Sequence, residues 1–189
     1  MARRPRLFVV SGPAGVGKGT LVSRVRAMRP HLGLPVSATT REPRPGEIDG
    51  ESYRFLSDEE FDKLVDDGEF LEWAKVHDHR YGTLRSEVDR CIDNGDSVVL
   101  EIDMQGGMNV RKAYPGTICV FIDPPSWDTL VSRLEGRGTE SEESMRIRLQ
   151  TARKELAHAD EYDERIVNDD LDVAVRDLLD LFERYENET

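Results

Sequence analysis

The sequence is poor in cysteine, which excludes two classes of small stabilised protein. It contains 2 cysteines in 189 residues, Cys91 and Cys119, and they are far apart, without the spacing typical of metal ligands. A disulfide scaffold and a zinc site both need more cysteines at closer spacing. We therefore expect two reduced, buried thiols. The length of the chain is sufficient for one compact domain with its own core.

Long apolar runs are also absent. The chain starts with the basic stretch MARRPR, and the apolar run that follows, residues 7–10, is too short for a secretory signal. No later run approaches the length needed to span a bilayer, about 20 apolar residues. We therefore expect a cytoplasmic protein that is not bound to a membrane.

Positive charge is in deficit. The chain has 26 Lys and Arg residues against 38 Asp and Glu residues, which gives a formal net charge of −12. An extended nucleic-acid-binding surface is basic, so we expect no nucleic-acid partner. A local group of arginines can still bind the phosphate of a small ligand.

Short apolar segments, by contrast, recur along the chain. Residues 7–10, 97–102, 117–122 and 165–168 have the length and composition of buried strands, and residues 20–28 have helical periodicity. Strands that alternate with helices predict an α/β fold built on a parallel, doubly wound sheet.

Other segments predict helices around this sheet. Residues 36–82 begin with many turn-forming residues and indicate an inserted lobe, in which Ser57–Glu60 has the form of a capping box. Further helices are expected at 84–92, after Ser126, after Ser141 and from 171 to 185, where apolar residues share one face.

A glycine-rich motif, SGPAGVGKGT, follows the first predicted strand at residues 11–20. Its glycines allow the tight turn that points successive backbone N–H groups at one anion, and the helix that follows adds the positive end of its dipole. Lys18 supplies a cation for the β- and γ-phosphates of a nucleotide. The residues predicted to bind the nucleotide are Gly12, Pro13, Ala14, Gly15, Val16, Gly17, Lys18, Gly19 and Thr20.

Gly19 departs from the usual motif, which has Ser or Thr directly after the lysine. That hydroxyl normally contacts Mg²⁺. Two replacements are open. Either the Thr20 hydroxyl reaches the ion or a phosphate, or phosphates and water hold most of the ion's shell, because Mg²⁺ gives up water reluctantly.

Beyond this loop, the sequence resembles the guanylate kinases nearly to its C-terminus. The segments that carry the resemblance are SGPAGVGKGT at 11–20, SATTREPRPGEIDGESYRF at 37–55, GEFLEWAKVHDHRYGT at 68–83, VVLEIDMQGG at 98–107, RGTESEES at 137–144 and IVNDDL at 166–171. Several motifs in one order are far more specific than any single motif. The resemblance implies ATP-dependent phosphorylation of GMP or dGMP to the diphosphate, with Mg²⁺ as the cofactor.

The resemblance also implies an arrangement of the chain. The implied arrangement is a P-loop kinase core with an inserted GMP-binding lobe and a mobile helical lid. All three parts belong to one guanylate kinase-like domain over residues 1–189. The core would comprise residues 5–35, 84–125 and 160–189, the lobe residues 36–83, and the lid residues 126–159.

The implied acceptor site lies in the lobe. Arg41 and Arg44, with Tyr53 and Tyr81, match the positions that hold the monophosphate of GMP, for which guanidinium groups and phenolic hydroxyls are suitable donors.

Glu72 is the implied reader of the base. Guanine presents two donors, N1–H and the 2-amino group, whereas adenine has an acceptor at N1 and no 2-amino group. A buried carboxylate pairs with the first base and is left unpaired by the second. Ser37 and Thr83 are the implied hydroxyl partners of guanine.

Two acidic positions follow the predicted strand at 97–102. Asp103 is implied at the guanine edge. Glu101 matches a position often held by Asp, and its role is open between indirect contact with Mg²⁺, contact with the base and structural anchoring.

Arg137 and Arg148 match the lid that closes over ATP. Because the charge of the transferred phosphoryl group spreads over three oxygens, positioned cations matter more than a strong base. The implied catalytic residues are Lys18, Arg41, Arg44, Arg137 and Arg148, and Arg133 and Arg146 are weaker candidates. Asn168 is implied near the adenine of ATP.

Two other functions match parts of this pattern. Another nucleoside monophosphate kinase would share the core, but Glu72 with Ser37 and Thr83 argues for guanine. A non-catalytic guanylate-kinase-like interaction module would be expected to have a damaged phosphate loop, whereas Lys18 and the lid arginines are present. His77 and His79 have no further ligands nearby in the sequence, so we expect no metal site there.

Overall fold

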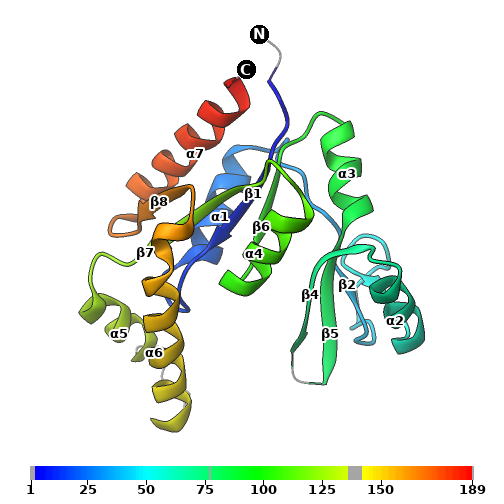
Figure 1. Cartoon of the computed structure of the whole chain (residues 1–189), viewed down its shortest axis with the longest axis horizontal. Coiled ribbons are helices and arrows are strands. Elements are labelled where there is room, and N and C mark those ends of the chain that lie inside the picture. The colour runs from blue at the N-terminus through cyan, green and yellow to red at the C-terminus, as the bar shows by residue number, and fades with distance from the viewer. Residues whose placement is uncertain (1–2, 77, 136–141, 189) are drawn as a thin grey trace.

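A parallel sheet of four strands forms the centre of the molecule (Figure 1). The computed structural model describes residues 3–76, 78–135 and 142–188. Strands β1 (Leu7–Ser11), β6 (Val98–Glu101), β7 (Ile118–Asp123) and β8 (Glu164–Val167) lie in the order β6-β1-β7-β8. All their pairings are parallel, which confirms the predicted α/β fold.

Helices cover both faces of this sheet because its strands are apolar on both sides. Phe8 of β1 packs in one cluster with α1 (Lys18–Met28) and α7 (Leu171–Asn187). Val9, the next residue, packs in another cluster with α3 (Arg85–Asp93) and α4 (Met104–Ala113). Successive side chains of a strand point to opposite faces, so the sheet is wound on both sides, as predicted.

Both cysteines lie in this second cluster as buried free thiols. Burial raises the pKa of the Cys119 thiol to about 11. Because such a thiol stays protonated at neutral pH, Cys119 acts as a small apolar side chain in the core.

A second sheet lies between α1 and α3 in the chain. Its strands β2 (Ala38–Thr39), β3 (Arg54–Phe55), β4 (Phe70–Val76) and β5 (His79–Leu84) lie in the order β3-β2-β5-β4. The predicted capping box is present, because Ser57 and Glu60 bond reciprocally at the start of α2 (Asp58–Asp66). Phe61 of α2 packs with Ala38 and Leu84 to form a small core of its own. Figure 1 shows β4, β5 and α2 projecting from the central sheet on the side away from α5 and α6.

Helices α5 (Trp127–Glu135) and α6 (Glu142–Ala157) follow β7. The predicted apolar stripe of α6 is present, and its members pack on the core: Met145, Leu149, Ala152 and Leu156. A short 3₁₀ helix, Ala159–Glu161, then leads into β8. No helix within the described residues has the length and apolar character needed to cross a membrane.

A buried ion pair fastens the C-terminal helix to the rest of the chain. Glu186 of α7 is 2% exposed and accepts hydrogen bonds from Arg29 Nη2 at 2.7 and 2.8 Å. The Ser97 hydroxyl, next to β6, donates to the same carboxylate at 2.6 Å. Removal of one partner from such a pair leaves the other charge buried without compensation.

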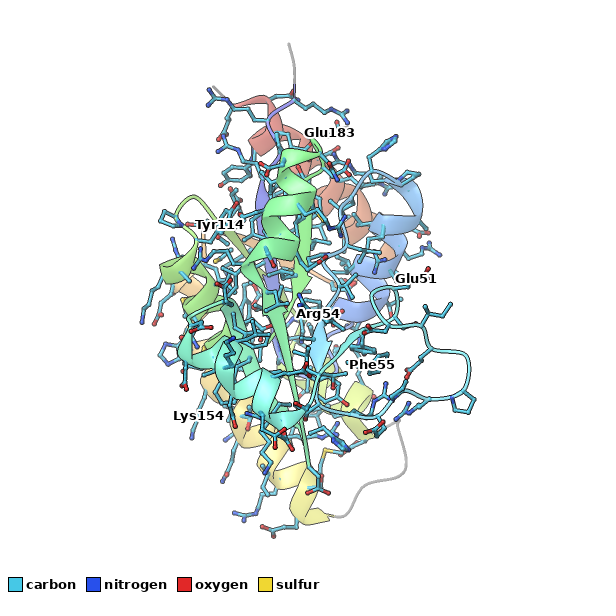
Figure 2. The ribbon with its side chains drawn as sticks, turned by 90° about the vertical axis from the view of Figure 1, so that its right-hand side faces the viewer. Glu51, Arg54, Phe55, Tyr114, Lys154 and Glu183 are labelled. Carbon is cyan, nitrogen blue, oxygen red and sulfur yellow. The ribbon has the colours of Figure 1, made fainter. Side chains whose placement is uncertain are left out.

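We predict that Glu186→Ala lowers the free energy of unfolding by about 3 kcal/mol, because Arg29 loses its buried partner. Glu183→Ala is the matched control. Glu183 lies on the same helix (Figure 2), and its 3.5 Å pair with Arg3 is exposed. The control should cost less than about 0.5 kcal/mol. Urea denaturation measures both variants, and equal losses would contradict a special role for the buried pair.

Candidate functional site

The loop between β1 and α1 turns tightly because glycine stands where its backbone requires it. Gly12 has a φ of 147°, and a Cβ there would lie 2.5 Å from the carbonyl oxygen of Ile122. Gly17, the residue before α1, has a φ of 97°, and a Cβ there would lie 2.6 Å from the side-chain nitrogen of Asn168. A larger residue would be strained at either position.

This loop concentrates positive charge and hydrogen-bond donors. No side chain of the described residues caps the start of α1, so the N–H groups of its first turn are available to an anion. The Lys18 ammonium donates to the carbonyl oxygens of Gly12 and Pro13, at 2.5 and 3.2 Å. The loop therefore has the cation and the N–H groups that a nucleotide phosphate needs. α1 begins at Lys18, earlier than the predicted start at Thr20.

Asn168 braces the loop. Its side-chain nitrogen donates to the carbonyl oxygen of Val16 at 2.8 Å, and its backbone N–H donates to Asp123 at 2.8 Å. Arg133 of α5 donates to the carbonyl oxygen of Asn168 at 3.0 Å, which ties a third segment to the loop. This bracing role did not follow from the sequence, and contact of Asn168 with adenine stays a prediction.

Gly19 and the Glu101 side chain lie next to each other. Glu101 ends β6, beside β1, and a Cβ on Gly19 would lie 3.4 Å from both of its carboxylate oxygens. This distance is an ordinary van der Waals contact, so the Glu101 carboxylate lies directly beside the first turn of α1. Thr20 is exposed on the same turn. A carboxylate and a hydroxyl are oxygen ligands of the kind that Mg²⁺ takes.

A cleft of about 510 Å³ lies between the second sheet, α1 and the end of β6. The predicted acceptor residues that line it are Ser37, Tyr53, Glu72, Tyr81, Thr83 and Asp103. They come from segments far apart in the sequence, which only the folded chain brings together. Glu101 and Arg26 line the cleft as well.

Glu72 and Thr83 meet because of the register of the β4–β5 hairpin, which places them opposite each other. The Thr83 hydroxyl donates to Glu72 Oε1 at 2.8 Å. Burial raises the pKa of Glu72, the Thr83 hydrogen bond opposes this rise, and the charge of Asp103 adds to it. The Glu72 carboxylate is thus a partly desolvated hydrogen-bond acceptor, and the Thr83 hydroxyl fixes its orientation.

Asp103 also has a structural role that the sequence analysis did not include. It is the N-cap of α4, and its Oδ1 accepts a hydrogen bond from the backbone of Gly106 at 2.7 Å. The cap fixes this carboxylate at the wall of the cleft.

Two predicted acceptor residues, Arg41 and Arg44, do not line the cleft; they lie in the chain segment between β2 and β3. The Arg41 guanidinium lies 5.5 Å from the ring centre of Tyr53 and 5.8 Å from that of Phe55. Its Nη2 donates to both carboxylate oxygens of Glu47, at 2.8 and 2.9 Å. Since Tyr53 lines the cleft, Arg41 is held at the edge of it. Arg44 is exposed.

The structure describes only part of the predicted lid. Arg148 lies on α6 and is partly buried, whereas Arg137 lies outside the described residues. His77, in the predicted lobe, lies outside them as well. Arg146, a weaker candidate, forms an exposed ion pair with Glu143 at 2.8 Å.

Glu155 of α6 lies close enough to Lys18 and Asp103 to interact with their charges, and the sequence analysis did not name it. It is partly buried, and burial raises the pKa of its carboxyl, while the charge of Lys18 lowers it and that of Asp103 raises it. α6 thus brings a carboxyl group close to the phosphate loop. The apolar stripe of α6 predicts that the helix packs on the core, but it does not indicate which polar side chain faces the loop.

The loop and the cleft adjoin each other. Glu101 lines the cleft and also lies against Gly19 at the loop, so a molecule in the cleft would be next to a phosphate on the loop. Two ligands held side by side can react without the entropic cost of an encounter. The arrangement therefore suits transfer of a phosphoryl group between two bound molecules.

Comparisons of sequence and structure agree on one family. The guanylate kinase family model matches residues 4–185. The chain is 52% identical to guanylate kinase of Streptomyces coelicolor over 178 residues, or 94% of this chain and 90% of the relative. It is also 52% identical to guanylate kinase of Cutibacterium acnes over 174 residues, or 92% and 87% of the two chains. The crystal structure of guanylate kinase from Anaplasma phagocytophilum matches with a TM-score of 0.72 at 29% identity, covering 99% of this chain and 89% of that one.

We predict that Asn168→Ala loosens the phosphate loop, because the Val16 carbonyl loses its buried donor. The free energy of unfolding should fall by about 1 to 3 kcal/mol, and amide hydrogen exchange in residues 12–18 should become faster. Asn94→Ala, at the exposed end of α3, is the control and should alter neither quantity. Unchanged exchange in the loop of Asn168→Ala would show that the amide does not brace it.

Proposed function

This chain belongs to the guanylate kinase family, and on that basis we propose that it transfers the γ-phosphoryl group of ATP to GMP or dGMP. The products are ADP and GDP or dGDP. The single observation that carries the choice of acceptor is the hydrogen-bonded pair of Glu72 and Thr83 inside the cleft. It presents a fixed carboxylate to a base that carries two donors on one edge.

The acceptor base is the first ligand to which the cleft is suited. Glu72 accepts from guanine N1–H and the 2-amino group. The Ser37 hydroxyl serves another polar atom of the base, and the Thr83 hydroxyl, whose hydrogen goes to Glu72, can only accept from the base. Asp103 lies at the guanine edge. Adenine would leave Glu72, which is partly buried, with no donor other than Thr83, and a site of this kind can discriminate by a factor of about 10⁴.

The acceptor phosphate is assigned to the edge of the cleft next to Tyr53. Arg41, Arg44, Tyr53 and Tyr81 donate to it, and the short distance from Arg41 to the Tyr53 ring supports this grouping. During transfer the two arginines also compensate the charge that develops on the phosphoryl group.

The donor phosphates are assigned to residues 12–20, with Lys18 on the β- and γ-phosphates. Arg137 and Arg148 close over ATP from the lid, and Asn168 lies near the adenine. Exclusion of water by this closure prevents transfer to water in place of GMP. The division into a core, a GMP-binding lobe at 36–83 and a lid at 126–159 is part of the same proposal.

Mg²⁺ is proposed as the cofactor that enters with ATP. Thr20 and Glu101 would hold it, and the approach of Glu101 to Gly19 supports this choice. The described residues contain no group of three or more His, Cys, Asp or Glu that could form a metal site alone, so phosphates and water supply the other ligands. When bound, the ion neutralises charge on the phosphates that Lys18 and the lid arginines orient.

The two alternative functions receive less support. The phosphate loop keeps the glycine geometry and the cation that a non-catalytic interaction module would not need. The polarity of Glu72 argues against AMP, CMP or UMP as the preferred acceptor. We infer a cytoplasmic location from the substrates, since both nucleotides are cytoplasmic metabolites.

A coupled assay of ADP release tests the proposed activity. Purified protein with ATP and Mg²⁺ should turn over GMP and dGMP, and AMP, CMP and UMP should be used about 10⁴-fold less efficiently. Addition of EDTA should stop the reaction. Absence of GMP-dependent turnover, or better use of AMP, would refute the assignment.

We predict that Glu72→Gln reduces the preference for GMP over AMP by about 10- to 100-fold, because a neutral amide places a donor against a guanine donor. The raised pKa of Glu72 gives a second readout. As pH falls through that pKa, the carboxyl becomes protonated and GMP binds more weakly.

The affinity ratio of wild type to Glu72→Gln should therefore fall toward 1 as the pH falls, and titration of the GMP phosphate cancels in this ratio. Glu69→Gln, an exposed carboxyl just before β4, is the control and should preserve the wild-type preference. A GMP/AMP preference that survives Glu72→Gln would remove Glu72 from the base site.

A further inference from the structure

Glu47 makes a set of contacts that neither the motifs nor the proposed reaction explains. Its carboxylate accepts two hydrogen bonds from Arg41 Nη2, at 2.8 and 2.9 Å. Its Oε2 accepts a third from the backbone N–H of Arg44, at 2.7 Å. One carboxylate thus joins both arginines assigned to the acceptor phosphate.

The turn around Glu47 holds this carboxylate independently of Arg41. The backbone N–H of Glu47 donates to the Arg44 carbonyl at 3.0 Å, and Gly46 between them has a φ of 91°. The bond from the Arg44 N–H to the carboxylate closes the same turn from the other side. Since the carboxylate is part of the turn, it is a fixed point on which the longer, more flexible Arg41 side chain is oriented.

Arg41 is correspondingly well ordered by its surroundings. Its side chain is 11% exposed, and that of Glu47 is 22% exposed. Nη1 donates to the Glu42 carbonyl at 2.7 Å, and the rings of Tyr53 and Phe55 lie beside the guanidinium. The ion pair raises the pKa of Arg41 and lowers that of Glu47, so both groups stay charged at neutral pH.

The donors that remain on Arg41 make its orientation important. A guanidinium has five N–H groups, of which Glu47 uses the two on Nη2 and Glu42 uses one on Nη1. The N–H groups that Glu47 and Glu42 do not use are the Nε–H and one Nη1–H, and the guanidinium lies near Tyr81, which also contributes to the raised pKa of Arg41. Because these are two separate donors, they reach a phosphate only if the plane of the group is set correctly.

We propose that Glu47 is a positioning residue of the acceptor-phosphate site, which holds the Arg41 guanidinium and the Arg44 backbone in the arrangement that receives the monophosphate of GMP. This inference rests on the proposed function. Arg44 has a complementary part, since its side chain is exposed and can reach the phosphate, while its charge also helps to lower the pKa of Glu47.

Kinetics of Glu47→Gln in the full chain test this proposal. Gln keeps the size of the side chain but lacks the charge and one of the two acceptor oxygens. We expect KM for GMP to rise about 10-fold, because Arg41 must then be ordered at the cost of binding free energy. KM for ATP should stay within about twofold of wild type, and kcat should change less than KM for GMP.

Guanosine separates positioning of the phosphate site from damage to the lobe. It contains the base and ribose of GMP but no phosphate, so its inhibition constant against GMP should be the same in wild type and Glu47→Gln. Glu51→Gln, an exposed carboxyl in the same loop that Figure 2 labels, removes the same charge and should leave all constants unchanged.

Three results would overturn the proposal. The first is an unchanged KM for GMP. The second is a lower KM for GMP, which would mean that Glu47 competes with the phosphate. The third is a loss of guanosine affinity as large as the loss for GMP. Arg41→Gln, measured in parallel, distinguishes failure of the proposed function from failure of the proposed role of Glu47. If wild type uses GMP and Arg41→Gln raises its KM while Glu47→Gln does not, the proposed function stands and the role of Glu47 falls.

Discussion

The close approach of the Gly12 backbone to β7 is the constraint on which the donor end of the molecule depends. Because a side chain at position 12 would collide with the Ile122 carbonyl, only glycine lets the chain leave β1 and turn at once into α1. That turn directs the first N–H groups of α1 and Lys18 to one point. The bond from Asn168 to the Val16 carbonyl then holds the turn from the opposite side.

The acceptor end depends on a different constraint, the register of a hairpin. A shift of one residue between β4 and β5 would turn Glu72 to the other face of the sheet, away from Thr83 and the cleft. The cleft also concentrates negative charge, because Glu72, Asp103 and Glu101 all line it. The partial burial of Glu72 and the like charge of Asp103 beside it favour ligands that bring hydrogen-bond donors or cations.

Local signals in the sequence predicted most of the elements, and the exceptions have physical reasons. The capping box at Ser57 and the apolar stripe of α6 depend on residues three or four apart, and both are present. α1 begins earlier than its apolar periodicity predicts, because the left-handed Gly17 and not an apolar residue starts it. Strand β5 (His79–Leu84) was not predicted, because its pairing with β2 and β4 holds polar and small residues in a sheet.

The sequence by itself determined the α/β class, the phosphate loop and the family resemblance. These features are written in short segments whose geometry is local. Only the tertiary structure decided that Asn168 braces Val16, that Glu101 lies beside Gly19, and that Glu72 meets Thr83 at the cleft. Each of these contacts joins separate segments, and their distance is set by how the sheets and helices pack, which no local pattern of residues encodes.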